Sequence, residues 1–161
     1  MKQRVFRSRI SVLIIGIFLG VYLLLFPISV HLFHDKLYGT LCVIWGTIFV
    51  IPLLIFVGTR YIISGYILYL KIWFIPVGSF RIKDIVSVER SYNLLSAPAA
   101  SLKRLCIRIE HSENYLNKPN FWLISPVKEK EFIKDLISID PHIHINVPVE
   151  KGIWRFWDWD I

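Results

Sequence analysis

The chain has 161 residues, of which 55% are hydrophobic and 19% are charged, and its mean hydropathy is +0.54. Soluble proteins carry roughly 25% charged residues, so this composition excludes a disordered protein and indicates a membrane protein. The net charge is +7, but from Arg60 onward 14 basic residues stand against 11 acidic ones, an excess too small to indicate a nucleic-acid-binding protein.

Two uncharged runs near the N-terminus, residues 10–30 and 37–59, are each long enough to cross a bilayer. About 20 helical residues span roughly 30 Å of hydrocarbon, and a helix satisfies its own backbone hydrogen bonds in lipid. We therefore predict a transmembrane helical hairpin. The first run is longer than the apolar part of a signal peptide and no A-x-A-like site follows it, so we expect an uncleaved anchor.

Residues 1–9 form a basic N-terminus with four Lys or Arg side chains and no acidic one. Basic segments next to a membrane helix stay on the cytoplasmic side. We therefore expect the N-terminus in the cytoplasm and, after two crossings, residues 60–161 there as well.

Gly16 and Gly20 form a G-x-x-x-G pattern in the first predicted helix. Small residues at this spacing let another helix approach closely. That helix would be the second one of the hairpin, or one from a second protomer in a homodimer. Since glycine is common in membrane helices, a third interpretation gives the pair no special role.

Strand and turn signals alternate from residue 60 to residue 124. Ser64-Gly65 predicts a tight turn, and the strand after it continues to a second turn at residues 76–79. The later elements are a strand over 80–90, a loop over 91–101, a strand over 105–110, a loop over 111–120 and a strand over 121–124.

One helix is predicted to follow the strands, with Ser125 as its N-cap and Pro126 at its first position. The charged residues between 128 and 135 are expected to face water, opposite an apolar stripe made of Phe132, Ile133, Leu136 and Ile137. A last short strand is expected over 142–147. Residues 60–147 therefore form an α+β domain behind the membrane hairpin.

Three blocks of this domain keep a recognisable order: residues 82–88 (IKDIVSV), residues 96–105 (SAPAASLKRL), and Ile124-Ser125-Pro126 followed by Phe132, Leu136 and Pro141. Over about half the chain they resemble the bacterial pleckstrin-homology-like (PH-like) domains, which commonly follow one or two transmembrane helices. The resemblance implies a bent antiparallel sheet, or partly open barrel, capped by one C-terminal helix. It also implies a bacterial cytoplasmic membrane, and it implies no enzymatic activity. A glycine commonly separates the second and third strands of these domains, whereas this sequence has none between Ile72 and Pro76.

The residues themselves also give no catalytic centre. No G-x-S-x-G, P-loop, H-E-x-x-H or paired-cysteine motif occurs, and Cys106 is interpreted as a structural thiol. His142 and His144 would share one strand face, but no third metal ligand is indicated nearby. The polar residues at 31–36 are interpreted as the ends of the helices. We therefore predict no enzyme, no metal and no cofactor.

Two basic pairs in the domain are candidate contacts for anionic lipid headgroups, because the bilayer is within reach. They are Arg81 with Lys83, and Lys103 with Arg104. The alternative interpretation is a solvated face with local ion pairs.

The C-terminal tail, residues 148–161, is rich in aromatic side chains between charged ones. Such a segment suits a membrane interface or a groove on another protein, and it would also be satisfied by folding back across the domain's own sheet. The candidate contact residues are Trp154, Phe156, Trp157 and Trp159.

Three functions remain open from the sequence. The first is a non-enzymatic, membrane-anchored PH-like module that binds a peptide, or another membrane or cytoplasmic protein, at the cytoplasmic face. The second is a sensor of anionic lipid headgroups. The third, which rests on analogy with small anchored proteins of this shape, is an immunity-like protection against a membrane-active peptide.

Overall fold

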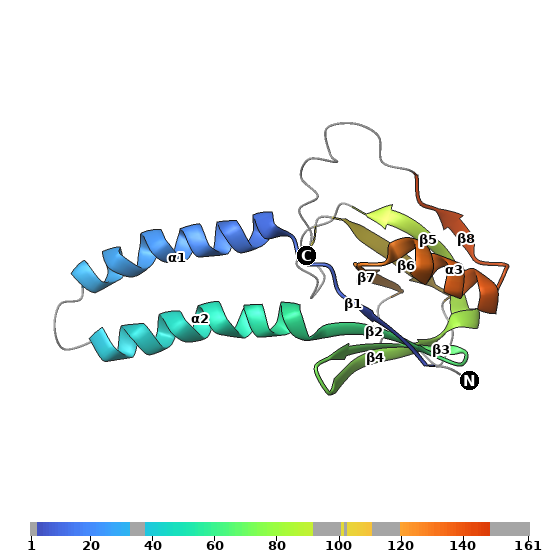
Figure 1. Ribbon diagram of the computed structural model, residues 1–161, viewed down its shortest axis with the longest axis horizontal. Coiled ribbons are helices and arrows are strands. Elements are labelled where there is room, and N and C mark those ends of the chain that lie inside the picture. The colour runs from blue at the N-terminus through green and yellow to red at the C-terminus, as the bar shows by residue number, and fades with distance from the viewer. Residues whose placement is uncertain (1–2, 33–37, 92–100, 102, 111–119, 149–161) are drawn as a thin grey trace.

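The computed structural model describes residues 3–32, 38–91, 101, 103–110 and 120–148. Two long helices extend to one side, and a domain of strands with one further helix lies at their other end (Figure 1). The predicted architecture, a helical hairpin followed by an α+β domain, is confirmed.

The helices α1 (Val12–Leu32) and α2 (Tyr38–Gly58) lie close to the predicted spans. Both are long and apolar enough to cross a membrane. Their apolar side chains are widely exposed, with Leu23 at 62% and Val43 at 69%, and soluble proteins rarely expose apolar surface on this scale. These two helices therefore fit a bilayer.

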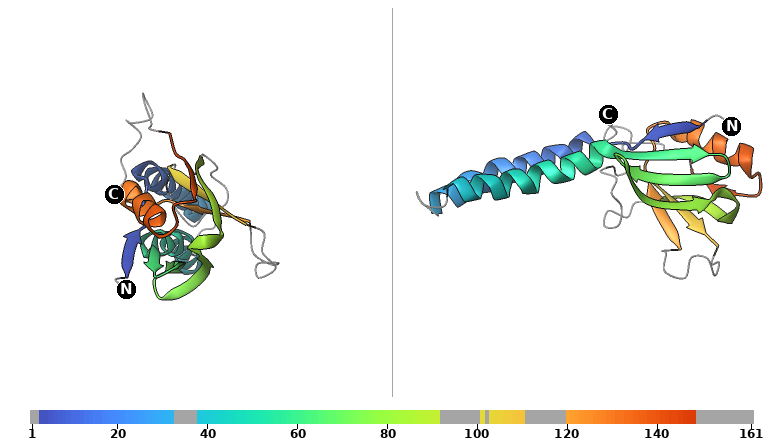
Figure 2. Two further views of the ribbon diagram at one scale, coloured as in Figure 1. Left: turned by 90° about the vertical axis from the view of Figure 1, so that its right-hand side faces the viewer. Right: turned by 90° about the horizontal axis from the view of Figure 1, so that it is seen from below.

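The N-terminus, expected to lie outside the domain, contributes a strand to it. β1 (Arg4–Arg7) pairs antiparallel with β2 (Thr59–Ser64), which follows α2 directly, and Phe6 is buried in the core. β3 (Ile67–Ile72) and β4 (Ile75–Arg81) complete a sheet in the order β1-β2-β3-β4 (Figure 2). Because β1 and β2 share one sheet, the helical hairpin leaves and re-enters the domain on the same side.

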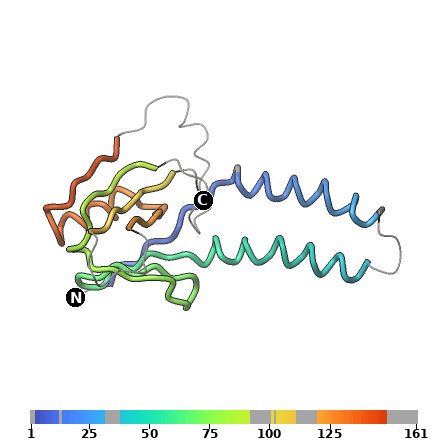
Figure 3. Tube along the Cα trace, turned by 180° about the vertical axis from the view of Figure 1, so that it is seen from behind, coloured from blue at the N-terminus to red at the C-terminus, as the bar shows by residue number. Residues whose placement is uncertain are grey.

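The turn between β3 and β4 comes earlier than predicted. Residues 76–79 belong to β4, and the chain reverses at Trp73 and Phe74, on the side of the domain that faces the helices (Figure 3). Trp73 has a φ of 56°, a conformation that favours glycine. Two hydrogen bonds to α2 hold it there, since its backbone N–H donates to the Gly58 carbonyl and its indole N–H to the Leu54 carbonyl, both at 2.8 Å.

The second sheet contains β5 (Ile85–Ser91), β6 (Arg104–Ile109), β7 (Phe121–Ile124) and β8 (His144–Asn146), in the order β7-β6-β5-β8. A short 3-10 turn, η1 (Ile82–Asp84), divides the single strand predicted over 80–90. The predicted strands over 105–110 and 121–124 are confirmed, and the loops predicted over 91–101 and 111–120 lie largely outside the described residues. Within the described residues the two sheets do not close into a barrel, which agrees with the expected PH-like fold.

The third helix, α3 (Glu129–Ile139), starts later than the predicted cap at Ser125. The reason is that the segment between β7 and α3 pairs with the residues that follow β1. The Arg9 N–H donates to the Ser125 carbonyl (2.6 Å), the Val127 N–H donates to the Arg7 carbonyl (3.0 Å), and a further bridge joins Ser8 and Pro126. Residues that pair with a strand in this way cannot also form the first turn of a helix.

The apolar stripe of α3 is confirmed at Phe132 and Leu136, which have no exposed surface, while Ile137 remains 39% exposed. The expectation that all charged residues of the helix face water is wrong at two positions. Asp135 is buried and accepts a hydrogen bond from Arg4 (2.5 Å), and Glu129 pairs with a cation of the second sheet. Both carboxylates connect α3 to strands far away in the sequence, which periodicity along the helix does not indicate.

Tyr61 fills the corner where the two sheets and the N-terminal segment meet. It is 1% exposed, and its hydroxyl accepts a hydrogen bond from the Ser125 N–H (3.0 Å) and lies 3.1 Å from Ser8 Oγ. Burial raises the pKa of this hydroxyl above its ordinary value, and its hydrogen bonds with Ser8 and Ser125 oppose the shift only in part.

This raised pKa predicts a loss of stability in alkali. The free energy of unfolding keeps the contribution of Tyr61 below about pH 10 and loses it as the pH rises further, because the unfolded chain releases the tyrosine proton first. We expect Tyr61→Phe to reduce this alkaline loss and to cost about 1 kcal/mol near neutral pH, since the Ser125 N–H loses its acceptor. Denaturant titrations of the full chain in detergent at a series of pH values measure both effects. Tyr66→Phe, at an exposed tyrosine, is the control, and identical pH profiles for the Tyr61 variant and the parent protein would contradict the prediction.

Candidate functional site

The four cations proposed for headgroup contact lie at two different ends of the domain. β2 runs away from the helices, and Arg81 pairs with Ile67 just after the far turn of β2 and β3. The Lys83 ammonium lies 6.0 Å from the ring of Tyr66, which belongs to that same turn. Arg81 and Lys83 therefore lie at the end of the domain remote from α1 and α2.

Lys103 and Arg104 lie at the opposite end, which faces the helices. Arg104 is only 3% exposed and donates from Nε to the Ser101 carbonyl (2.7 Å). Burial lowers the pKa of its guanidinium. Of the second pair, Arg104 is buried and Lys103 is partly exposed. The two basic pairs therefore lie apart in the domain, and their contact with anionic headgroups stays a prediction.

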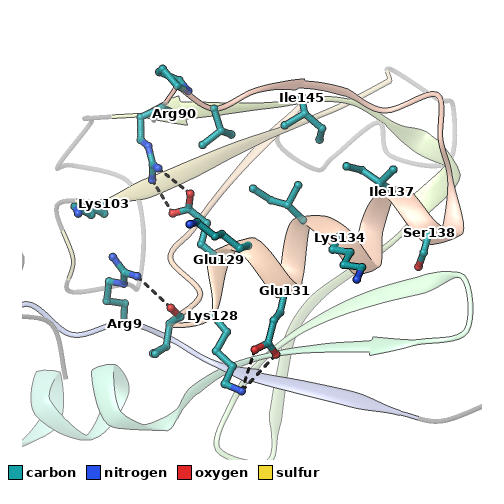
Figure 4. A pocket seen from close by; sticks show the side chains of 15 residues that line it. Arg9, Arg90, Lys103, Lys128, Glu129, Glu131, Lys134, Ile137, Ser138 and Ile145 are labelled. Atoms are coloured by element: carbon teal, nitrogen blue, oxygen red, sulfur yellow. Dashed lines mark hydrogen bonds and ion pairs between the residues drawn. The ribbon is translucent and has the colours of Figure 1, made fainter. Parts of the chain in front are cut away.

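Lys103 instead lines an open groove of about 1150 Å³ between α3 and β8 (Figure 4). Arg9, Lys103 and Lys128 lie toward the end nearest the membrane helices, and Ser138 lies at the other end. The floor is apolar and is made mainly of Ile133, Ile137, Ile145 and Val147. Further basic side chains on the α3 side of the groove are Lys130 and Lys134.

A bidentate ion pair crosses this groove. Arg90 of β5 donates from Nη1 and Nη2 to the two carboxylate oxygens of Glu129, at 2.8 and 2.7 Å. The side chains are only 8% and 17% exposed, so the pair is shielded from solvent and its geometry is fixed. This pair joins the start of α3 to the second sheet and links the two walls of the groove at that point.

The lining of the groove makes it a candidate binding surface. Nonpolar side chains at its base would accept the apolar face of a peptide, and ammonium and guanidinium groups at its edge would attract carboxylates. Of the groove residues, only Lys103 was a candidate from the sequence, because the others come from the N-terminus, β5, α3, β8 and the segments next to them. Ile137 was predicted from the sequence as part of the apolar stripe of α3, and its 39% exposure in the groove appears only in the structure.

Among the described residues, the candidate metal-binding and thiol residues do not form a metal site. His142 and His144 are exposed, and among the described residues no group of three His, Cys, Asp or Glu side chains could hold a metal ion. Cys106 is partly buried, and burial raises the pKa of its thiol. The proposed structural role of Cys106 stays a prediction.

The two glycines of the first helix do not meet the second one. No atom of the described residues outside α1 lies within 4 Å of the place where a Cβ on Gly16 or Gly20 would be. The two helices meet through aromatic rings. The centroids of the Tyr22 and Phe49 rings, for example, lie 5.1 Å apart. Contact of the glycines with a second protomer stays a prediction.

The aromatic tail residues Trp154, Phe156, Trp157 and Trp159 lie outside the described residues, which end at Pro148 in the groove wall. Their proposed contacts therefore stay predictions.

Comparison with known proteins gives one match. The family model described as bacterial PH domain matches residues 59–140, which run from the start of β2 to the residue after α3. No curated protein and no solved structure matches the chain. The matched segment covers half of the chain and leaves β1 and both membrane helices outside it.

Proposed function

Because the chain belongs to the bacterial PH domain family, we propose that it is a non-enzymatic, membrane-anchored module that binds a protein or peptide partner at the cytoplasmic face of the bacterial membrane. Two exposed apolar helices support the anchor. The basic N-terminus supports the cytoplasmic side. The pairing of β1 with β2 supports a topology in which the N-terminus and the domain lie on the same side of the membrane.

The groove between α3 and β8 is the observation that carries this proposal. Its volume of about 1150 Å³ suits a short segment of chain and exceeds the usual range of about 300–1,000 Å³ for small-molecule sites. The apolar floor and basic edge favour a segment with apolar side chains on one face and acidic ones on the other. The PH-like fold adds to this interpretation because such domains generally act by binding.

Site-specific photocrosslinking in cells tests the proposal. A photoreactive amino acid replaces Ser138, at the groove end, in the full chain, and a matched probe replaces Val86, which is 51% exposed on β5. We expect one dominant adduct from position 138 that is absent from position 86. Adding Ile137→Asp should abolish it, because a carboxylate on the apolar floor repels an acidic partner and removes apolar contact.

Two results would count against peptide binding in the groove. One is an equal set of adducts from both probe positions, and the other is an adduct from position 138 that survives Ile137→Asp. Adducts with lipid alone would favour the headgroup-sensing function instead.

A further inference from the structure

The turn between β3 and β4 carries a continuous run of exposed apolar residues, Trp73 to Val77, which we term the hairpin tip. Phe74 is 85% exposed, and Ile75 is 56% exposed. Trp73 and Val77 are each exposed by nearly half. A cluster of this kind on a domain surface indicates a contact surface, and the groove between α3 and β8 does not include any of these residues.

The hairpin tip is fixed beside the end of α2. The Trp73 indole N–H donates to the carbonyl of Leu54, one helical turn before Gly58 where α2 ends. Leu54 and Val57 are themselves 50% and 58% exposed, so the apolar surface of the span continues onto the tip. One helical turn is about 5.4 Å, and the tip thus lies level with the last turn of the membrane span.

A row of three cations lies next to the tip on the outer face of the same sheet. Arg7, Arg60 and Lys71 stand directly opposite one another across β1, β2 and β3, and Arg60 is only two residues beyond Gly58. Like charges in this arrangement repel. Within the part of the chain that the structure describes, none of these three cations forms an ion pair. Anionic lipid headgroups at this depth would offset the repulsion.

We propose that this edge of the first sheet is a third membrane contact of the protein, in addition to α1 and α2. The hairpin tip lies in the bilayer interface beside α2, where Trp and other apolar side chains are favoured, and Arg7, Arg60 and Lys71 bind the phosphates of anionic lipids directly above it. Together they hold the domain in one orientation on the membrane. This contact concerns the bilayer and does not depend on a partner in the groove.

Fluorophore depth measurements test the proposal on the full chain in vesicles of phosphatidylcholine and phosphatidylglycerol. Cys42 and Cys106 are replaced by Ala, and an environment-sensitive label is attached at Phe74→Cys or, as the matched control, at Tyr66→Cys. Tyr66 is 54% exposed at the opposite turn of the same sheet. We expect a blue-shifted emission that brominated lipid quenches at position 74, and neither effect at position 66.

The same measurement identifies other occupants of the tip. A label at position 74 that behaves like the one at position 66 would overturn the proposal. So would a blue shift that brominated lipid does not quench, because it would mean that a protein, or a second copy of this chain, covers the tip.

Two further variants check the contacts that place the tip. A Cβ on Gly58 would overlap the Trp73 ring, whereas a Cβ on Gly46 in the same helix meets no described atom within 4 Å. With the label at position 74, Gly58→Ala should reduce quenching and Gly46→Ala should not. Neutralising the row with Arg60→Gln and Lys71→Gln should remove the dependence of quenching on phosphatidylglycerol. Unchanged quenching in both the Gly58 and the neutralised variants would contradict the proposal.

Discussion

Replacing Phe6 by Ala is expected to lower the free energy of unfolding of the domain by about 3–5 kcal/mol, the usual cost of removing a buried phenylalanine ring. Phe6 is 6% exposed, and its ring meets that of Phe132 edge-on at 5.2 Å between centroids. It lies before both membrane helices, so a large loss would show that the domain requires the N-terminal strand. Urea unfolding of the full chain in detergent micelles, followed by tryptophan fluorescence, measures this loss.

Val5→Ala is the matched control for Phe6→Ala. Val5 lies on the same strand but is 53% exposed, so its truncation should change the free energy of unfolding by no more than about 0.5 kcal/mol. Equally small effects of both substitutions would mean that β1 contributes little to the domain. A large effect of Phe6→Ala also implies that a fragment starting at residue 60 lacks part of its core, and binding experiments therefore need the full chain.

Removing the Glu129 carboxylate is expected to destabilise the domain by about 3 kcal/mol, because Glu129→Ala leaves the shielded Arg90 guanidinium without its bidentate acceptor. Only 8% of the Arg90 side chain is exposed, so water compensates little. The same urea titrations measure the loss. Arg90 would also become available to an acidic ligand in the groove, so this variant links the stability of the domain to the proposed binding surface.

Glu131→Ala is the control for this second substitution. Glu131 pairs with Lys128 within one helical turn at 3.2 Å, but the two side chains are 57% and 66% exposed. Exposed pairs of this kind contribute at most about 0.5 kcal/mol. If the two alanine variants have the same stability, shielding from solvent does not strengthen the Arg90–Glu129 pair.

The strand at the N-terminus explains how the domain is attached to its anchor. α1 follows β1 after a short segment that is hydrogen-bonded to the domain, with Ser8 N–H donating to the Thr59 carbonyl (3.0 Å), and α2 continues directly into β2. Both helices therefore meet the domain without a flexible linker among the described residues. A domain held in this way keeps the Arg9 end of its groove close to the membrane.

The sequence by itself determined the features that depend on local composition and spacing. The length of the two uncharged runs predicted the membrane helices, the alternation around Ile107 predicted β6, and the turn at Ser64-Gly65 separated β2 from β3 correctly. In each case the physical reason is local, because the length of an apolar run, the alternation along a strand and the residues of a turn all depend on consecutive residues. The family resemblance then supplied the bent shape of the sheet and the position of the helix as its cap.

Only the tertiary structure decided the features that join distant residues. In the sequence, Phe6 lies within the basic N-terminal segment that indicates topology. In the structure its strand pairs with β2, where Phe6 lies opposite Tyr61, 55 residues later. Trp73 takes the place of a turn glycine because α2 accepts two of its hydrogen bonds. The groove, likewise, combines residues from Arg9 to Pro148. Contacts between such distant residues depend on how the elements pack, and no short stretch of sequence encodes that packing.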